Sequence, residues 1–259
     1  MLNHKLLTFL ICLLCGLNTA LAQFGFSHEV GLISGPIAFQ SDYGERKNWN
    51  TNTGNSGVGV GLIHYINFSY RADCNCYTTD TFFNDHFKIR NEVSWNKTTL
   101  NHLGPESKKT SMESLKLRSM QGEANNLNIG TQLEFYPLSI RDFSAGAFSF
   151  APYGSIGAQF TYYNPKVKSS LPGGIENEDN IFYEFTDGAI NTTSGTTWSV
   201  VGSVGTRYKL TVLSDLLIDL RWQYFFSNWT DGLNHEHNIQ DKANDWLVWF
   251  NIGYVYYLD

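Results

Sequence analysis

The sequence is poor in the features on which most other protein classes depend. Beyond residue 22 it has no run of about 18 consecutive apolar residues, which excludes a membrane-spanning helix there. Charged residues make up only 16% of the 259 residues, and proline occurs 6 times. Two of the 4 cysteines lie in the first 22 residues, so only Cys74 and Cys76 remain. Two cysteines exclude a disulfide framework.

The first 22 residues have the composition of an export signal. A basic start is followed by an apolar run, and small residues precede a predicted cleavage between Ala22 and Gln23. Cys15 follows a leucine, where a lipoprotein signal requires a small residue, and this argues against lipid attachment. We therefore expect residues 1–22 to be a signal peptide and residues 23–259 to form one domain.

Charge and aromatic content narrow the class of that domain. The net charge is −6, and removal of Lys5 with the signal makes it −7, which argues against binding to nucleic acid. Aromatic residues are abundant at 15%, and glycine occurs 23 times. Aromatic girdles at the two surfaces of a bilayer explain such a bias in a β-barrel.

Alternation of apolar and polar residues predicts strands. From Gly57 to Tyr70, valine, leucine, isoleucine and aromatic residues share one face, while glycine, asparagine and serine share the other. A period of two is that of a β-strand. The whole chain predicts an all-β fold, an eight-stranded antiparallel up-and-down transmembrane barrel with long outer loops. The expected strands are residues 27–39, 57–70, 86–98, 126–136, 148–163, 197–210, 215–227 and 245–258.

The lengths of the connections set the predicted orientation. If the first strand starts in the periplasm, the long polar connections 99–125 and 164–196 face outward, and the tight turn 211–214 faces the periplasm. The connection 71–85 is long for a periplasmic turn. It contains Cys74 and Cys76, which are candidates for a local or intermolecular disulfide.

Charged residues decide which face of each strand points inward. A basic residue exposed to hydrocarbon near the bilayer midplane costs roughly 2 to 4 kcal/mol. An eight-stranded barrel is just wide enough for its inward side chains to fill it, so we expect paired charges that plug the barrel, with a proton or small-ion path as the alternative. The expected interior charges are Glu29, Lys88, Arg90, Glu92, Glu134, Arg207, Lys209, Asp219 and Arg221.

Catalytic and metal-binding readings have weak support. A lipid hydrolase needs a serine or threonine nucleophile beside a histidine, and neither His28 nor His64 has a serine at a recognisable spacing on its face. His235-Glu236-His237 offers two histidine ligands without identifiable partners. We therefore predict no catalytic residues, no cofactor and no metal.

Several short motifs resemble those of a known group. Residues 133–137 (LEFYP), 150–154 (FAPYG), 162–166 (YYNPK), 229–234 (WTDGLN) and 253–258 (GYVYYL) resemble small outer-membrane β-barrel proteins of Bacteroidetes-type bacteria, a largely uncharacterised family. The resemblance spans most of the chain after residue 22 and rests on short motifs. It implies an eight-stranded outer-membrane barrel, and it brings no catalytic residues with it.

The favoured function is that of a non-enzymatic protein in the outer membrane of a Gram-negative bacterium. It would have a plugged, charged interior and a structural or partner-binding role, in contact with outer-membrane lipid and with other envelope proteins. The alternative is a lipid-active or small-ligand-binding outer-membrane barrel. A soluble lipocalin-like barrel requires an apolar interior, which the charged inward faces disfavour. The predicted facing implies that Ile129→Arg blocks membrane assembly and that Gln132→Arg is tolerated better.

Overall fold

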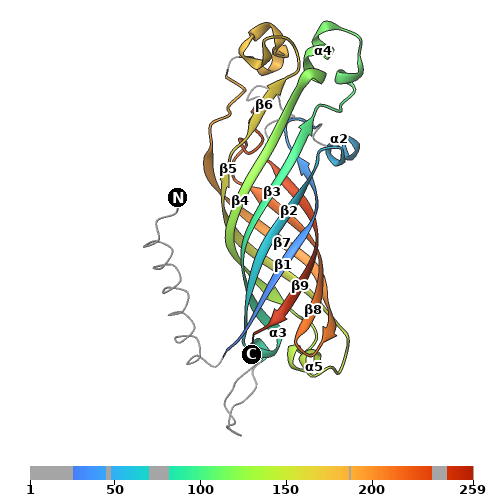
Figure 1. Cartoon of the computed structure of the whole chain (residues 1–259), viewed down its shortest axis with the longest axis vertical. Helices are drawn as coiled ribbons and strands as arrows, with labels where there is room; N and C mark the ends of the chain where they lie inside the picture. The colour runs from blue at the N-terminus through green and yellow to red at the C-terminus, as the bar shows by residue number, and fades with distance from the viewer. Residues whose placement is uncertain (1–25, 45–47, 70–81, 187, 235–243, 259) are drawn as a thin grey trace, which may run out of the picture.

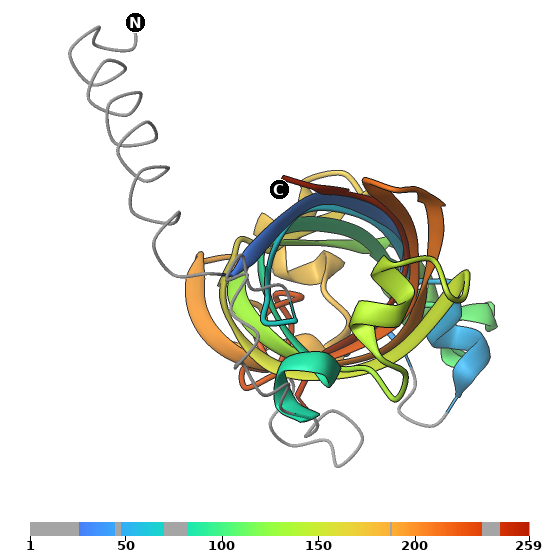
Figure 2. The same ribbon diagram turned by 90° about the horizontal axis from the view of Figure 1, so that it is seen from below.

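The computed structural model describes residues 26–44, 48–69, 82–186, 188–234 and 244–258. Eight strands close into an antiparallel barrel in the ring order β3-β2-β1-β9-β8-β7-β5-β4, with β4 paired back to β3. Figure 1 shows the slanted strands of the tall barrel, and Figure 2 shows the closed ring end-on. The predicted barrel is confirmed. Its strands are β1 (Ser27–Gln40), β2 (Ser56–Asn67), β3 (Phe87–Asn101), β4 (Met120–Phe135), β5 (Phe150–Tyr163), β7 (Gly195–Thr211), β8 (Ser214–Phe225) and β9 (Trp246–Tyr257).

The two ends of the barrel differ. β1 begins and β9 ends at the lower end in Figure 1, here called the inner end, where α3 (Phe82–His86) and α5 (Ile140–Ser144) lie. The opposite, outer end has long connections that contain short helices and one more strand. No helix in the described ranges is long and apolar enough to cross a membrane. The outer elements are α2 (Trp49–Thr53), α4 (Met112–Ser119), β6 (Lys166–Ser169) and the 3-10 helices Glu106–Lys108, Gly174–Glu176, Glu178–Asn180 and Tyr183–Phe185.

The tight turn between β7 and β8 forms as the sequence predicts. The Thr211 and Ser214 hydroxyl oxygens lie 2.8 Å apart, and the Leu213 amide donates to Thr211 Oγ1 at 3.2 Å. Threonine and serine close such turns through side-chain bonds to the local backbone. The turn holds the β7–β8 hairpin at the inner end, as predicted from its length.

The strands that flank the outer connection between β3 and β4 are longer than predicted. β3 runs to Asn101 and β4 starts at Met120, so part of the expected connection 99–125 is a paired ladder. Four residues of β4 also pair with β6, within the connection expected at 164–196. The outward side chains of this extension are polar, as at Gln121 and Glu123, so hydrophobic alternation ends while backbone pairing continues. The alternation of apolar and polar residues therefore predicts the apolar part of these strands and not their full length.

One side of the barrel interior is apolar. Ile33 and Ile37 of β1 and Leu247 and Trp249 of β9 point inward and are buried. The glycine-rich inward face of β2 makes room for them, because a Cβ on Gly59 would lie 2.5 Å from Trp249 Cζ2. The charged residues therefore line the rest of the interior, mainly from β3, β4, β7 and β8.

Candidate functional site

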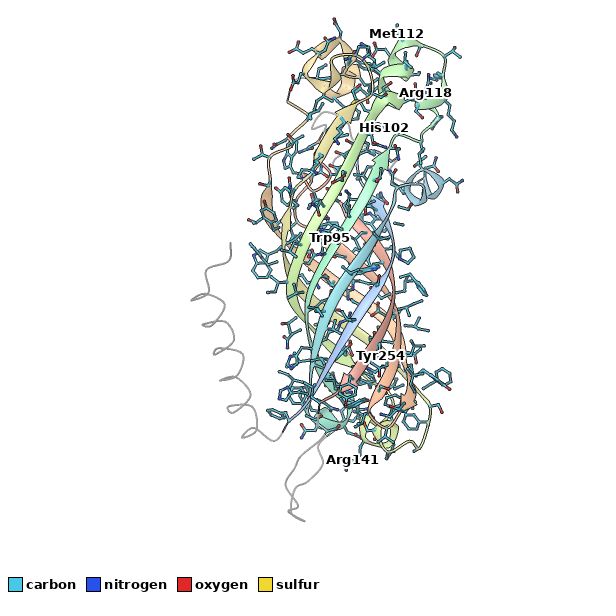
Figure 3. All side chains as sticks on the ribbon, viewed as in Figure 1. Trp95, His102, Met112, Arg118, Arg141 and Tyr254 are labelled. Carbon is cyan, nitrogen blue, oxygen red and sulfur yellow. The ribbon has the colours of Figure 1, made fainter. Side chains whose placement is uncertain are left out.

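The outside of the barrel is an apolar belt. On β3 the belt extends over nine residues from Phe87 to Trp95, a height of roughly 21 Å for a strand tilted by about 40°. Outward residues such as Leu62 and Ile129 are 62% and 56% exposed. Figure 3 shows Trp95 toward the upper part of the barrel and Tyr254 toward its inner end. Large exposed apolar side chains around a closed barrel, with aromatics at both limits, match a surface that faces lipid.

The interior contains every residue of the predicted charge set. Eight of the nine are buried with at most 2% exposure, and the Lys209 side chain is 12% exposed. They fall into two groups connected by ion pairs. The mid-barrel cluster consists of Arg90, Glu92, Glu134, Asp219 and Arg221. The inner-end cluster consists of Glu29, Lys88, Arg207, Lys209 and a residue absent from the predicted set, Asp215.

Glu92 is the centre of the mid-barrel cluster. Arg221 binds it in a bidentate manner at 2.5 and 2.6 Å, and Arg90 Nη2 lies 2.9 Å from its second oxygen. Arg90 also contacts Asp219 at 2.9 Å and Glu134 at 3.5 Å. These contacts join β3 to β8 across the interior, which adjacent-strand pairing does not do. Bidentate guanidinium–carboxylate pairs are among the stronger hydrogen-bonded contacts in proteins.

The inner-end cluster joins β1, β3 and β7. Lys88 Nζ donates to Glu29 Oε1 at 2.6 Å, and Arg207 donates to the other oxygen of Glu29. Arg207 also lies 3.5 Å from Asp215, and Lys209 Nζ lies 3.4 Å from the other Asp215 oxygen. The cluster contains three cations and two carboxylates, whereas the mid-barrel cluster contains two cations and three carboxylates. The ten charges therefore balance.

Sequence reasoning missed Asp215 and the buried tyrosines that complete the network. Asp215 shares its inward face with Asp219 and Arg221, so its parity in the strand was an available signal. Parity also places Tyr65 on the same face of its strand as Gly59 and Gly61, but it does not indicate that the tyrosines bond to carboxylates of other strands. Tyr65 and Tyr136 donate to Glu134, and Tyr153 donates to Asp219 at 2.9 Å.

A second buried polar group lies in the outer loops. Asp231 accepts hydrogen bonds from the amides of Asp42 and Leu233, and Asp245 accepts from the amide and hydroxyl of Thr230. Burial raises the pKa of Asp231 to about 7, and burial together with the charge of Asp231 raises the pKa of Asp245 well above its usual value. Asp231 joins the β8–β9 connection to the β1–β2 connection, whereas Asp245 joins two parts of the β8–β9 connection.

The outer loops also bury a histidine. The ring of His102 packs on Tyr43 with centroids 4.6 Å apart and on Phe185 at 5.3 Å. Burial lowers the pKa of His102 to about 3, which keeps its ring neutral at physiological pH. The outer end is thus a packed cap with its own small core.

His28 and His64 meet on the outside of the barrel. His28 Nδ1 and His64 Nε2 lie 3.1 Å apart with stacked rings, and His64 Nδ1 lies 3.4 Å from the Asn91 amide nitrogen. Thr131 donates to the Asn91 carbonyl at 2.8 Å. A row of hydrogen-bonded polar side chains therefore crosses four strands on the outer surface of the barrel, within the height of the apolar belt. In these contacts His64 meets the imidazole ring of His28 and the side-chain amide of Asn91.

Several predicted residues lie outside the described ranges. These include the cleavage site at Ala22 and Gln23, the pair Cys74 and Cys76, and the segment 235–237. Among the residues that the structure describes, no group of three or more His, Cys, Asp or Glu side chains could hold a metal ion.

The closed ring, the apolar belt and the charge-filled interior together define a small transmembrane-type β-barrel. No family model matches the chain, and no curated protein sequence is similar to it. Solved structures with a related outline include Neisserial surface protein A, at 12% identity and a TM-score of 0.43, covering 88% of this chain and 96% of that one. Another is Ail of Yersinia pestis crystallised with the heparin analogue sucrose octasulfate, at 11% identity and a TM-score of 0.42, covering 91% and 100%. A major outer membrane protein of Thermus thermophilus has 12% identity, a TM-score of 0.44 and coverage of 89% and 99%.

Proposed function

We propose that this chain is a non-enzymatic outer-membrane protein of a Gram-negative bacterium, closed to ions and active through partner binding at its outer cap. The observation that carries the closed lumen is the balanced network of ten charges. Their side chains are almost fully buried and are paired across the interior. A continuous water path would expose them.

The outer cap supports the binding role. Met112 and Leu115 on α4 are 67% and 39% exposed, and Tyr183 is 61% exposed on a neighbouring loop. Figure 3 shows Met112 at the far outer tip. We call these three residues the outer tip. Exposed apolar side chains on a rigid, membrane-anchored support favour contact with another protein.

The alternative of a lipid-active barrel has less support. The bonds of His64 go to His28 and Asn91, and neither partner is a hydroxyl nucleophile. General-base catalysis requires the base within hydrogen-bond reach of the group it activates.

The test is the native size of the full-length protein after extraction in mild detergent, with co-purifying chains identified by mass spectrometry. We expect a complex that Met112→Asp disrupts and that Gln121→Asp, an exposed change on β4 outside the three tip residues, leaves intact. A wild-type protein that is always monomeric would contradict partner binding. Large steady conductance of the purified protein in planar bilayers would contradict the closed lumen.

A further inference from the structure

The row of polar side chains on the outer surface of the barrel lies at the middle of the apolar belt. It begins at His28 on β1 and continues over β2, β3 and β4, which lie side by side on the face toward the viewer in Figure 1. His64, Asn91 and Thr131 are directly opposite one another in the register of these three strands. Asn91 is the fifth of the nine belt residues 87–95 on β3, so it lies halfway up the belt.

The middle of the belt is a costly place for polar groups. Thr131 is likewise the fifth of nine residues from Leu127 to Phe135, and four residues of a strand tilted by about 40° rise roughly 10 Å. The row is therefore far from the headgroups of both leaflets. On other sides of the barrel the middle outward residue is apolar, as at Ile156 on β5 and Leu220 on β8. Polar side chains at this depth indicate a functional contact, because hydrocarbon offers them no hydrogen-bond partners.

The hydrogen bonds within the row all run in one direction. The Thr131 hydroxyl donates to Asn91 Oδ1 at 2.8 Å, and Asn91 Nδ2 donates to His64 Nδ1 at 3.4 Å. Since His64 Nδ1 accepts, the hydrogen of the neutral ring is on Nε2, which donates to His28 Nδ1 at 3.1 Å. The row thereby offsets part of its own cost in lipid.

Asn91 retains hydrogen-bonding capacity after these bonds. A side-chain amide has two hydrogens and an oxygen with two lone pairs, and the bonds to His64 and Thr131 use one of each. Because these two neighbours lie on the strands to either side, the edge of the amide that points away from the barrel is the one that remains. One donor and one acceptor on the same edge match the same edge of a second amide across a twofold axis. The residue at the centre of the row is therefore complementary to itself, as a contact between two identical chains requires.

Apolar side chains flank the row on both sides. Lipid chains are as apolar as these side chains, so apolar area alone gives two barrels little reason to associate within a membrane. Hydrogen bonds between polar side chains supply that reason, and the apolar side chains supply contact area around them. The flanking rows, each in direct register over β2, β3 and β4, are Leu62, Val93 and Ile129 toward the outer end and Ile66, Ile89 and Leu133 toward the inner end.

We propose that two copies of this chain associate within the membrane through this face of β2, β3 and β4, with the Asn91 amides of the two copies paired on a twofold axis. The inference goes beyond the proposed function, because neither a closed lumen nor a partner at the outer tip requires a contact inside the membrane.

The experiment is sedimentation equilibrium of the purified full-length protein in an uncharged detergent whose density is matched by the solvent. It measures the dissociation constant of the dimer with no other protein present. We expect a reversible equilibrium between monomer and dimer. Met112→Asp, which removes a side chain of the outer tip, should leave this equilibrium unchanged, so that failure of the dimer and failure of partner binding at the tip are distinguished.

Two variants and one control locate the contact. Asn91→Leu keeps the branched shape of the side chain and removes its donor and acceptor. It should weaken the dimer at least about tenfold, although it makes the outer wall more apolar. Val93→Trp leaves the row intact and adds a bulky ring beside it, which should weaken the dimer by at least as much. The matched control is Val204→Trp, an outward change on β7, three strands away from β3, and it should have no effect.

A wild-type protein that stays monomeric at every concentration would overturn the proposal, even if this face binds a different membrane protein. An unchanged dissociation constant in folded Asn91→Leu protein would also overturn it. If Asn91→Leu fails to fold, Val93→Trp and its control decide, and equal dissociation constants in these two variants would rule out contact through this face.

Discussion

Glu92→Gln tests whether the interior charges stabilise the barrel as pairs. The change keeps the shape of the side chain and removes its charge, which leaves Arg221 and Arg90 facing a neutral amide. Glu92 is the carboxylate that Arg221 contacts in the described part of the chain, so after the change its guanidinium would face one neutral amide oxygen and the Trp249 ring, 4.9 Å away. Removing one partner of a buried pair typically costs about 3 to 5 kcal/mol. The folding equilibrium constant should fall by roughly a hundredfold to several thousandfold.

The matched control is Glu123→Gln. Glu123 also bridges two cations, Lys97 at 3.0 Å and Lys166 at 3.4 Å, but it lies on the outer extension and its side chain is 22% exposed against 0% for Glu92. Solvent-exposed ion pairs contribute at most about 1 kcal/mol. The assay is urea titration of the barrel in lipid vesicles, followed by the fluorescence of its 7 tryptophans. Equal losses in the two variants would refute the reasoning from burial.

Two further predictions concern the belt and the cap. Ile129→Arg should lower stability in lipid vesicles by roughly 2 to 4 kcal/mol, because it exposes a charge to hydrocarbon. Gln121→Arg, on the same face of β4 but above the belt, should cost little. Comparable losses in the two variants would contradict the assigned membrane position. Because burial raises the pKa of Asp231 to about 7, the stability that the neutral carboxyl gives the cap is complete below about pH 4 and is lost as pH rises to about 7, with Asp245 adding to the loss. In limited proteolysis, cleavage of the cap should therefore increase as pH rises to about 7, and Asp231→Asn should reduce this increase. The lowered pKa of His102 acts in the opposite direction, because it removes stability as pH falls below about 6.5 in both proteins. Identical profiles of the two proteins would refute the role of Asp231.

The facing of the strands could be read from the sequence, but the neighbours across the interior could not. Parity in the strand places a side chain inside or outside, as it does for Glu92 and Arg221. It does not say that β3 and β8 lie opposite each other, because this follows from how far each strand is displaced along its neighbour when the sheet closes. The network therefore required the structure, even though nearly all its members were predicted.

The interior limits how well Gln132→Arg, the change predicted to be tolerated better than Ile129→Arg, can be accommodated. Gln132 is fully buried and donates to Glu92 at 3.4 Å, while its carbonyl accepts from Ser155 at 3.0 Å. An arginine there would add a third guanidinium beside Arg90 and Arg221 without a new carboxylate. In a filled interior the balance of charges limits substitution more than the polarity of the face does.

The cross-barrel pairs also explain why a protein would retain buried charges that apolar residues could replace. Backbone pairing alone cannot distinguish one strand register from another displaced by two residues, since the same faces point in and out. Such a slip between β7 and β8 would move Arg221 away from Glu92 and Arg207 away from Glu29, leaving uncompensated charges in the interior. Each misaligned pair would carry the penalty of a broken buried ion pair, which is several times the strength of a backbone hydrogen bond. The charge network therefore favours one closure of the barrel over its neighbours in register, independently of any ligand.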